Sequence, residues 1–332
     1  MKKPRLASVL AAACGLAGCV DHPMGYLSGA AGPAAAPGQH LAVGFVAIAI
    51  GVVVIIAAMI VLAIGSGRRS TRRDGDVVHR DARGLGWIYW GIGITVPVLL
   101  AMTVWSFAVT REISARPAGP ALRVQITGHL WWWELRYPDA IPGNIFSTAN
   151  ELVIPTGMPV RLDLSSADVI HDFWVPKLGP KIDVIPGQET HAWLQANRPG
   201  VYLGQCAEYC GLEHAHMGIR VVALAPAQFA AWQQAMRMPA QAPASHGAEV
   251  FATSCSSCHA VRGTQAGGIL GPDLTHLALR STLAAGVLPN TREGRLEWIG
   301  HTQSVKPGAQ MPEIPLSPAD LSAVADYLGE LR

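Results

Sequence analysis

The chain has 332 residues, half of them hydrophobic, and a formal net charge of only +2. This length is enough for two or three folded units, and the high apolar fraction indicates an apolar segment in addition. The near-neutral charge gives no indication of the strongly basic surface that nucleic-acid binding uses.

The N-terminus has the form of an export signal. A basic start is followed by a short apolar run, Leu6–Leu16; the basic residues are Lys2, Lys3 and Arg5. The tetrapeptide LAGC that ends at Cys19 resembles a lipoprotein signal-peptidase site, which predicts a signal peptide over 1–18 and lipidation of Cys19. An ordinary small-residue cleavage site, with Cys19 incidental, is the alternative. Residues 19–40 are expected to form a flexible linker rich in Gly, Ala and Pro.

Two uncharged apolar stretches, 41–64 and 87–109, predict a transmembrane helical hairpin over 41–110. The second carries Pro97 and is flanked by interfacial aromatics: Trp87, Tyr89, Trp90 and Trp105. Arginines gather between the two spans, which places that loop in the cytoplasm and both chain ends outside: Arg68, Arg69, Arg72, Arg73, Arg80 and Arg83. Neither span contains a histidine, so an oxygen-reducing haem site would have to lie on a partner chain.

Beyond the hairpin the pattern changes to short alternating runs such as LRVQITG and IRVVAL, separated by Pro and Gly turns. This pattern predicts a Greek-key β-sandwich over 111–225 on the outer side. A short helix at 226–237 opens a helix-and-linker segment, 226–245. The last unit, 246–332, is expected to be all-α, with a helix starting at Ser317-Pro318.

The sequence C206-AEY-C210-GLE-H214-AH-M217 places two thiols, an imidazole and a thioether within twelve residues, and His171 stands upstream. Soft ligands of this kind favour copper or zinc. Two thiolates can bridge two copper ions, which would give a low reorganisation barrier. A disulfide, a Cys2His2 zinc site and a mononuclear blue-copper site are the alternatives, although each leaves one or more of these side chains unused.

Three segments, GHLWWWEL, DVIHDFWVPKLGPKIDVIPG and CAEYCGLEHAHMG, resemble the signature segments of cytochrome c oxidase subunit II. The resemblance runs from the hairpin to about residue 224 and implies a cupredoxin-like domain with a dinuclear copper centre. It implies as copper ligands His171, Cys206, Cys210, His214, Met217 and the backbone carbonyl of Glu208. His216 is the local rival, but the family spacing H-x-x-M selects His214. The carboxylate of Glu208 is further expected to reach a magnesium ion at the boundary with subunit I.

The resemblance also assigns Trp131, in the run Trp131–Trp133, to electron entry towards the copper. The alternative is that all three tryptophans are ordinary core residues of the sandwich. Many family members carry a glutamate near the start of the second span, whereas RGLGWIYWG has none. This departure from the family pattern counts against proton uptake through this chain.

C255-SS-C258-H259 is the attachment signature of a covalent c-type haem, with His259 as one axial ligand. A thioredoxin-like pair or half of a zinc site is the alternative, and neither requires the histidine. Met311 is the only methionine after this signature, which makes it the expected sixth ligand ahead of His276 and His301. The segments GPDL and QMP resemble class I cytochrome c. That resemblance implies a hydrogen bond from His259 to the carbonyl of Pro272.

The combination resembles the caa-type oxidases, in which cytochrome c is fused to subunit II. It implies electron transfer from haem to copper and on to subunit I, where O2 is reduced, with the fusion raising the effective concentration of the donor. The expected partners are subunit I, subunit III and an external donor such as a cytochrome c or the cytochrome bc complex. The expected location is a bacterial inner membrane. A copper-containing nitric oxide reductase subunit and a stand-alone tethered carrier are the alternatives.

Overall fold

The computed structural model describes residues 24–25, 29–67, 83–115, 122–241 and 243–332. The predicted signal peptide, Cys19 and most of the arginine-rich loop lie outside these residues. The described chain divides into two compact units, one formed by 36–115 and the other by the remaining residues. Each is described by itself.

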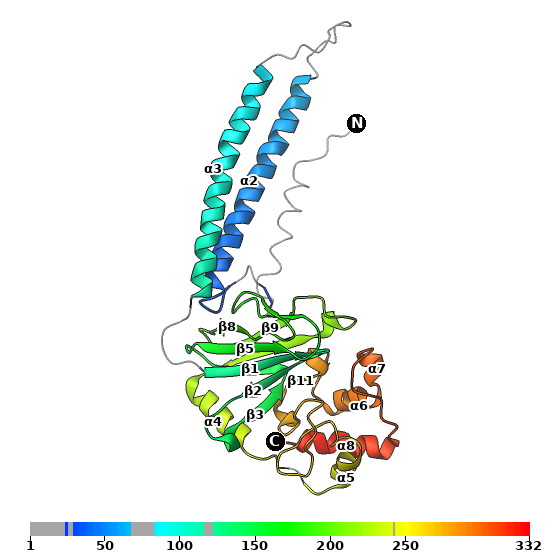
Figure 1. Cartoon of the computed structure of the whole chain (residues 1–332). Coiled ribbons are helices and arrows are strands. Elements are labelled where there is room, and N and C mark those ends of the chain that lie inside the picture. The colour runs from blue at the N-terminus through cyan, green and yellow to red at the C-terminus, as the bar shows by residue number, and fades with distance from the viewer. Residues whose placement is uncertain (1–23, 26–28, 68–82, 116–121, 242) are drawn as a thin grey trace. The chain divides into compact units, whose positions relative to one another are not determined.

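The first unit is a pair of long helices, α2 (Ala36–Gly67) and α3 (Arg83–Ser114) (Figure 1). Both are long and apolar enough to cross a membrane. Their side chains face outward, as lipid contact requires; Leu62 and Phe107 are 69% and 72% exposed. The helices meet where Gly44 of α2 leaves room for the ring of Trp105, which also packs edge-to-face on Phe45 at 6.3 Å. The predicted hairpin is therefore present, and α3 runs through Pro97 without ending.

Both helices extend beyond the predicted spans. Helix α2 begins at Ala36, inside the segment predicted as a linker, because Pro37 fits the first turn of a helix, where no intrahelical N–H bond is needed. Just before it, Ala31 donates its N–H to the carbonyl of Lys177 at 2.8 Å and accepts from Asn197 at 2.8 Å. Ala31, within the predicted linker, is thus hydrogen-bonded inside the second unit.

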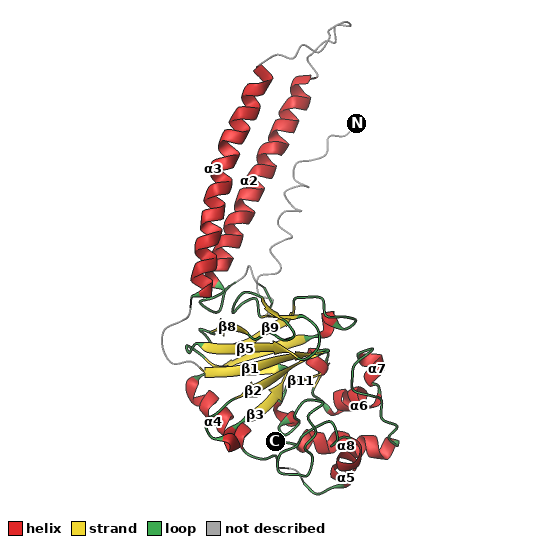
Figure 2. Cartoon of the chain, viewed as in Figure 1, coloured by secondary structure: helices red, strands yellow, loops and turns green. Residues whose placement is uncertain are grey.

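The second unit contains a sandwich of two five-stranded sheets, shown in yellow in Figure 2. The first sheet has the spatial order β3 (Phe146–Ala149), β2 (Trp132–Tyr137), β1 (Leu122–His129), β5 (Val160–Ser166) and β8 (Thr190–Leu194). The second has the order β4 (Glu151–Pro155), β10 (Gly218–Leu224), β9 (Gly200–Cys206), β6 (His171–Trp174) and β7 (Ile182–Val184). Strands β1 and β5 pair in parallel, as do β4 and β10, and the other pairs are antiparallel. This arrangement agrees with the predicted sandwich.

Alternation along the strands builds the sandwich core. On β1, Val124 and Ile126 are buried while their neighbours are partly exposed, as expected for a strand with one face on the core. Trp133, fully buried, is the largest of the core side chains. Helix α4 (Pro226–Arg237) then follows β10 and places Trp232 against Tyr137 and Phe146 at the edge of this core.

The C-terminal domain, His246–Arg332, contains α5 (His246–Ser254), α6 (Arg292–Gly300), the short α7 (Thr302–Val305) and α8 (Pro318–Glu330). Gly247 of α5 lies directly against the carbonyl of Ala323, which lets α5 pack closely on α8. Ser317 caps α8 by accepting from the N–H of Asp320 at 3.1 Å, as the Ser-Pro signal predicted. A small hairpin, β11 (Thr282–Leu283) and β12 (Leu288–Pro289), interrupts the helices. The predicted fold class, with two apolar helices, a sandwich and a helical C-terminal domain, is confirmed.

Candidate copper and haem sites

Two loops at one end of the sandwich bring the sulfur ligands together. Cys206 ends β9, and Cys210 follows in the turn that leads to η3 (His214–His216). Their Sγ atoms lie 3.7 Å apart and both thiols are free, whereas a disulfide would need about 2.05 Å. Met217 is fully buried, with its Sδ 3.9 Å from Sγ of Cys210. The structure therefore gathers three sulfur atoms in one buried place.

The two imidazoles approach different thiols. Nδ1 of His171, at the start of β6, lies 3.9 Å from Sγ of Cys206, while Nδ1 of His214 lies 3.5 Å from Sγ of Cys210. Such an arrangement gives each histidine its own side of the thiol pair. The ligand atoms of His171, Cys206 and Cys210 all lie within 4.8 Å of one another, so this buried cluster could hold a metal ion.

The rival histidine is engaged elsewhere. Nδ1 of His216 lies 2.6 Å from the buried carboxylate of Glu213, which holds this ring away from the thiols. The carbonyl oxygen of Glu208 lies 3.2 Å from Sγ of Cys206, where a weak backbone ligand would have to be. The side chain of Glu208 is exposed. The predicted choice of His214 over His216 and of the Glu208 carbonyl stays a prediction.

The thiol pair has an uneven charge. The hydrogen bond shared by the two thiols lowers the pKa of Cys206 to about 3 and raises that of Cys210 well above its usual range. Burial lowers the pKa of His171, but its interactions with Cys206 and Asp168 outweigh burial, and the net shift is upward. A first thiolate is thus available at neutral pH, and a metal ion would have to displace the second proton.

Asp168 is a site residue that the sequence reasoning missed. Its Oδ1 lies 2.8 Å from Nε2 of His171 and its Oδ2 accepts from the N–H of Leu130 at 2.7 Å. The carboxylate leaves Nδ1 of the ring directed at Cys206, which is the usual arrangement behind a metal-bound histidine. Gly128 on β1 leaves room for the His171 ring, because a methyl group at this position would lie 2.8 Å from that ring. An acid three residues before the ligand histidine was the available signal.

Trp131 lies between the thiols and the C-terminal domain. Its Nε1 donates to the carbonyl of Cys210 at 2.9 Å, and the side chain is only 8% exposed. Trp133, in contrast, packs edge-to-face on the ring of His171 at 5.8 Å and belongs to the core. The structure thus connects Trp131 to the thiol loop, as the electron-entry assignment requires.

The haem attachment motif follows α5. Nδ1 of His259 donates to the carbonyl of Pro272 at 2.8 Å, which leaves Nε2 free for iron. Burial lowers the pKa of His259, so the ring is neutral, as a ligand must be. Gly271 lies against the ring, since a methyl group there would come within 2.5 Å of it. Next to it, Ile269 and Leu270 expose 89% and 73% of their surface, an apolar pair that suits a haem face.

Met311 lies in the loop between α7 and α8. Gln303 fixes this loop, since its Nε2 donates to the carbonyls of Ala309 and Met311, both at 2.9 Å. Among the described residues, no hydrogen bond joins Met311 to His259. Nε2 of His276, one of the alternatives for the sixth position, lies 3.0 Å from the carbonyl of Met238. The residues around the motif therefore fit a covalent haem, and Met311 stays the predicted sixth ligand, with His276 and His301 as the alternatives.

Comparison with known proteins gives matches for both parts. A family model described as cytochrome c oxidase subunit II, periplasmic domain, matches residues 140–224, and one described as cytochrome c matches residues 244–332. Cytochrome c oxidase subunit 2 of Alkalihalophilus pseudofirmus is 40% identical over 215 residues, which are 63% of this chain and 61% of that protein. Subunit 2 of Bacillus subtilis is 31% identical over 254 residues, 72% of this chain and 70% of that protein.

A solved structure, the periplasmic domain of subunit II of cytochrome oxidase from Bradyrhizobium japonicum, is 32% identical and covers 36% of this chain and 96% of that one, with a TM-score of 0.34. The chain spans less than two thirds of the length of the first relative and more than two thirds of the second. The two family matches imply copper in the sandwich and haem c in the C-terminal domain. With its two apolar helices the protein is membrane-anchored, with the sandwich on the periplasmic side. This chain therefore belongs to the cytochrome c oxidase subunit 2 family.

Proposed function

We propose that this chain is the electron-transfer subunit of a respiratory terminal oxidase of the caa type. It would accept electrons in its C-terminal domain and deliver them through the sandwich to oxidase subunit I, where O2 is reduced to water. When bound, a covalent haem c and a dinuclear copper centre supply one-electron redox chemistry. The observation that carries the proposal is the pairing of His171 with Cys206 and of His214 with Cys210 in one buried cluster.

The chain's own residues would hold these groups and fix their surroundings. The proposed copper ligands are His171, Cys206, Cys210, His214, Met217 and the carbonyl of Glu208; the proposed haem ligands are Cys255, Cys258, His259 and Met311. Asp168 orients one imidazole and Pro272 the other, each by one hydrogen bond of 2.8 Å. Because Cys206 and Met217 are fully buried, water is excluded from the sulfur cluster. Exclusion of water keeps the reorganisation on electron transfer small.

Several further points belong to the proposal. The exposed side chain of Glu208 is available to a magnesium ion shared with subunit I, and subunit III would complete the complex. The domain limits are proposed as 1–18, 19–40, 41–110, 111–225, 226–245 and 246–332. The membrane would be a bacterial inner membrane, with the N-terminus outside and Cys19 lipidated. An external cytochrome c or the bc complex would supply the electrons.

The test uses the full chain purified with its partner subunits. Flash reduction of the haem should be followed by loss of the haem signal and reduction of the copper centre. Electron paramagnetic resonance should show hyperfine structure from two equivalent copper nuclei. A haem that stays reduced while the copper stays oxidised, or zinc in place of copper, would overturn the proposal.

A further inference from the structure

The hairpin of the C-terminal domain enters the sandwich. Its tip, η5 (Ala284–Gly286), packs against β2, β10 and η3, that is, beside the loops that hold the thiols. Ala285 is 3% exposed, and its carbonyl lies where a methyl group on Gly218 of β10 would come within 2.6 Å. Contact this close excludes water and any side chain larger than hydrogen at Gly218. The two domains are therefore packed together at this hairpin.

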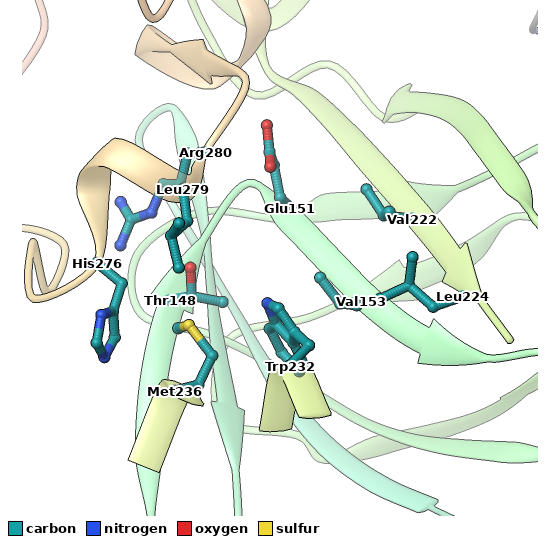
Figure 3. Close-up of a pocket in the computed structure, with 10 residues that line it drawn as sticks. All are labelled: Thr148, Glu151, Val153, Val222, Leu224, Trp232, Met236, His276, Leu279 and Arg280. Carbon is teal, nitrogen blue, oxygen red and sulfur yellow. The ribbon is translucent and has the colours of Figure 1, made fainter. Parts of the chain in front are cut away.

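At the base of the hairpin, the sandwich contributes a buried negative charge. Glu151 opens β4 and is only 7% exposed. Its Oε1 accepts from the N–H groups of Ser281 at 2.7 Å and Thr282 at 3.2 Å and from the hydroxyl of Ser281. Figure 3 shows Glu151 among the residues that line a pocket of about 120 Å³, to which both domains contribute. All donors to Glu151 come from the C-terminal domain.

At the tip of the hairpin, the C-terminal domain contributes a buried positive charge. Lys306, just after α7, is 3% exposed. Its Nζ donates to the carbonyls of Trp131 at 2.7 Å and His216 at 2.8 Å, both in the sandwich, and to that of Ala284 at 3.2 Å. Burial lowers the pKa of Lys306 to about 8, so the ammonium form still predominates at neutral pH. Each domain thus places one buried charge on backbone groups of the other.

These contacts close the surface over Trp131. Lys306 binds its carbonyl, and Gly308 lies so near that a methyl group there would be 3.4 Å from the indole ring. The left-handed backbone at Gly308, with φ of +79°, turns the loop across the ring and on towards Met311. On its other side the indole donates to the carbonyl of Cys210. The tryptophan therefore joins the Met311 loop to the thiol loop.

We propose that Lys306 and Glu151 are positioning residues that form a reciprocal charge clamp, which holds the C-terminal domain docked with its Met311 loop over Trp131. The clamp makes Trp131 an internal junction, closed to any soluble donor, so that external electrons enter only through the C-terminal domain. This inference rests on the proposed function and deepens it, since it fixes how the two cofactor domains are held together.

The clamp is specific because a shifted domain would leave both charges buried and unpaired. Removing one partner of a buried charged contact costs far more than losing a surface ion pair. A shift of one residue along the hairpin would also bring Ala285 into collision with β10 beside Gly218. Position and orientation are therefore fixed by the same few contacts. A flexible tether would fix neither.

The test compares Lys306→Met with the parent, as full chains in the assembled complex. Methionine keeps most of the side-chain volume but leaves the carbonyls of Trp131 and His216 without their donor. Haem-to-copper electron transfer after flash reduction should slow by about tenfold or more, because the rate depends steeply on how the donor is placed. The rate should be insensitive to ionic strength in the parent and should become sensitive in the variant, where docking has to be repeated in solvent.

Arg292→Met is the matched control. Arg292 is also a cation of the C-terminal domain, but its partners, Asp326 and Ser322, lie in that same domain. Its loss should leave the transfer rate and the salt response unchanged. Glu151→Gln should change both in the direction of Lys306→Met, because it removes the negative charge from the oxygen that accepts all three hydrogen bonds. Equal rates and salt responses in Lys306→Met and the parent would overturn the clamp.

Hydrogen exchange on the parent complex gives a second measurement, for which no variant has to fold. The amides of Ser281 and Thr282, bonded to Glu151, should exchange as slowly as those of the sandwich strands. Exchange at the rate of an exposed turn would overturn the docking. Because this reading does not involve the metals, it separates the failure of docking from the failure of the proposed electron transfer.

Discussion

Substitution of Asp168 by asparagine tests whether the copper site depends on the orientation of His171. The carboxylate accepts three hydrogen bonds, from Nε2 of His171 at 2.8 Å and the N–H of Val169 at 2.7 Å on Oδ1, and from the N–H of Leu130 at 2.7 Å on Oδ2. An amide has one acceptor oxygen. If the amide oxygen of the asparagine faces His171 and Val169, the amide N–H group faces the N–H of Leu130.

The least damaging orientation therefore loses one bond and leaves a donor facing a donor. An unsatisfied donor of this kind costs about 1–3 kcal/mol. The bond that remains to His171 also loses the assistance of the negative charge. Since second partners of metal-bound histidines are typically worth about 10–100-fold in metal affinity, we expect Asp168→Asn to weaken copper binding by roughly that factor.

The assay is a copper competition titration of the full chain against a chelator of known affinity, with the paramagnetic-resonance spectrum recorded at saturation. Asp139→Asn is the control. Asp139 lies in the same sandwich and also accepts three hydrogen bonds, from Ile141, Asn144 and Arg237, but touches no proposed ligand. If Asp168→Asn binds copper with the affinity and spectrum of the Asp139 variant, the orientation argument is refuted.

Two further predictions concern the haem. Gly271→Ala puts a methyl group 2.5 Å from the ring of His259, so the haem should remain covalently attached while its axial ligation is disturbed; optical spectra should show high-spin haem, and Gly267→Ala, which meets nothing within 4 Å, should not. Met311→Leu keeps the apolar volume but removes the sulfur, so the haem reduction potential should fall in a potentiometric titration. An unchanged potential would exclude Met311 as a ligand.

The sequence predicted best the features that are local. Two long uncharged stretches predict helices whatever surrounds them, and Ser317-Pro318 marks the start of α8 because a cap and its helix are neighbours in the chain. The close spacing of Cys206 and Cys210 likewise predicts a shared site, since one tight turn is enough to bring them together. His171 is 35 residues from Cys206 and was identified through family resemblance, because no local rule pairs β6 with β9.

Features that depend on the contact between domains could not be predicted. A lysine in a loop after a short helix is normally solvated, and nothing local to Lys306 distinguishes it. The sequence of the hairpin tip does not predict its backbone either. Ala284 and Ala285 adopt the left-handed conformation, with φ of 52° and 60°, which is usually found at glycine. Both are explained only by the sandwich into which they pack.

The docked hairpin also changes the physical meaning of the fusion. A flexible tether would act only by raising the effective concentration of the donor and would leave its orientation to repeated encounters. Here the C-terminal domain is also bonded to α4, since its Arg262 donates to the carbonyls of Met236 and Arg237 at the end of that helix. The C-terminal domain thus contacts α4 through Arg262, and it contacts the sandwich through the hairpin and the Met311 loop. Its orientation is therefore set when the chain folds. The entropy of docking is then lost once, when the chain folds, and is not lost again at each electron transfer.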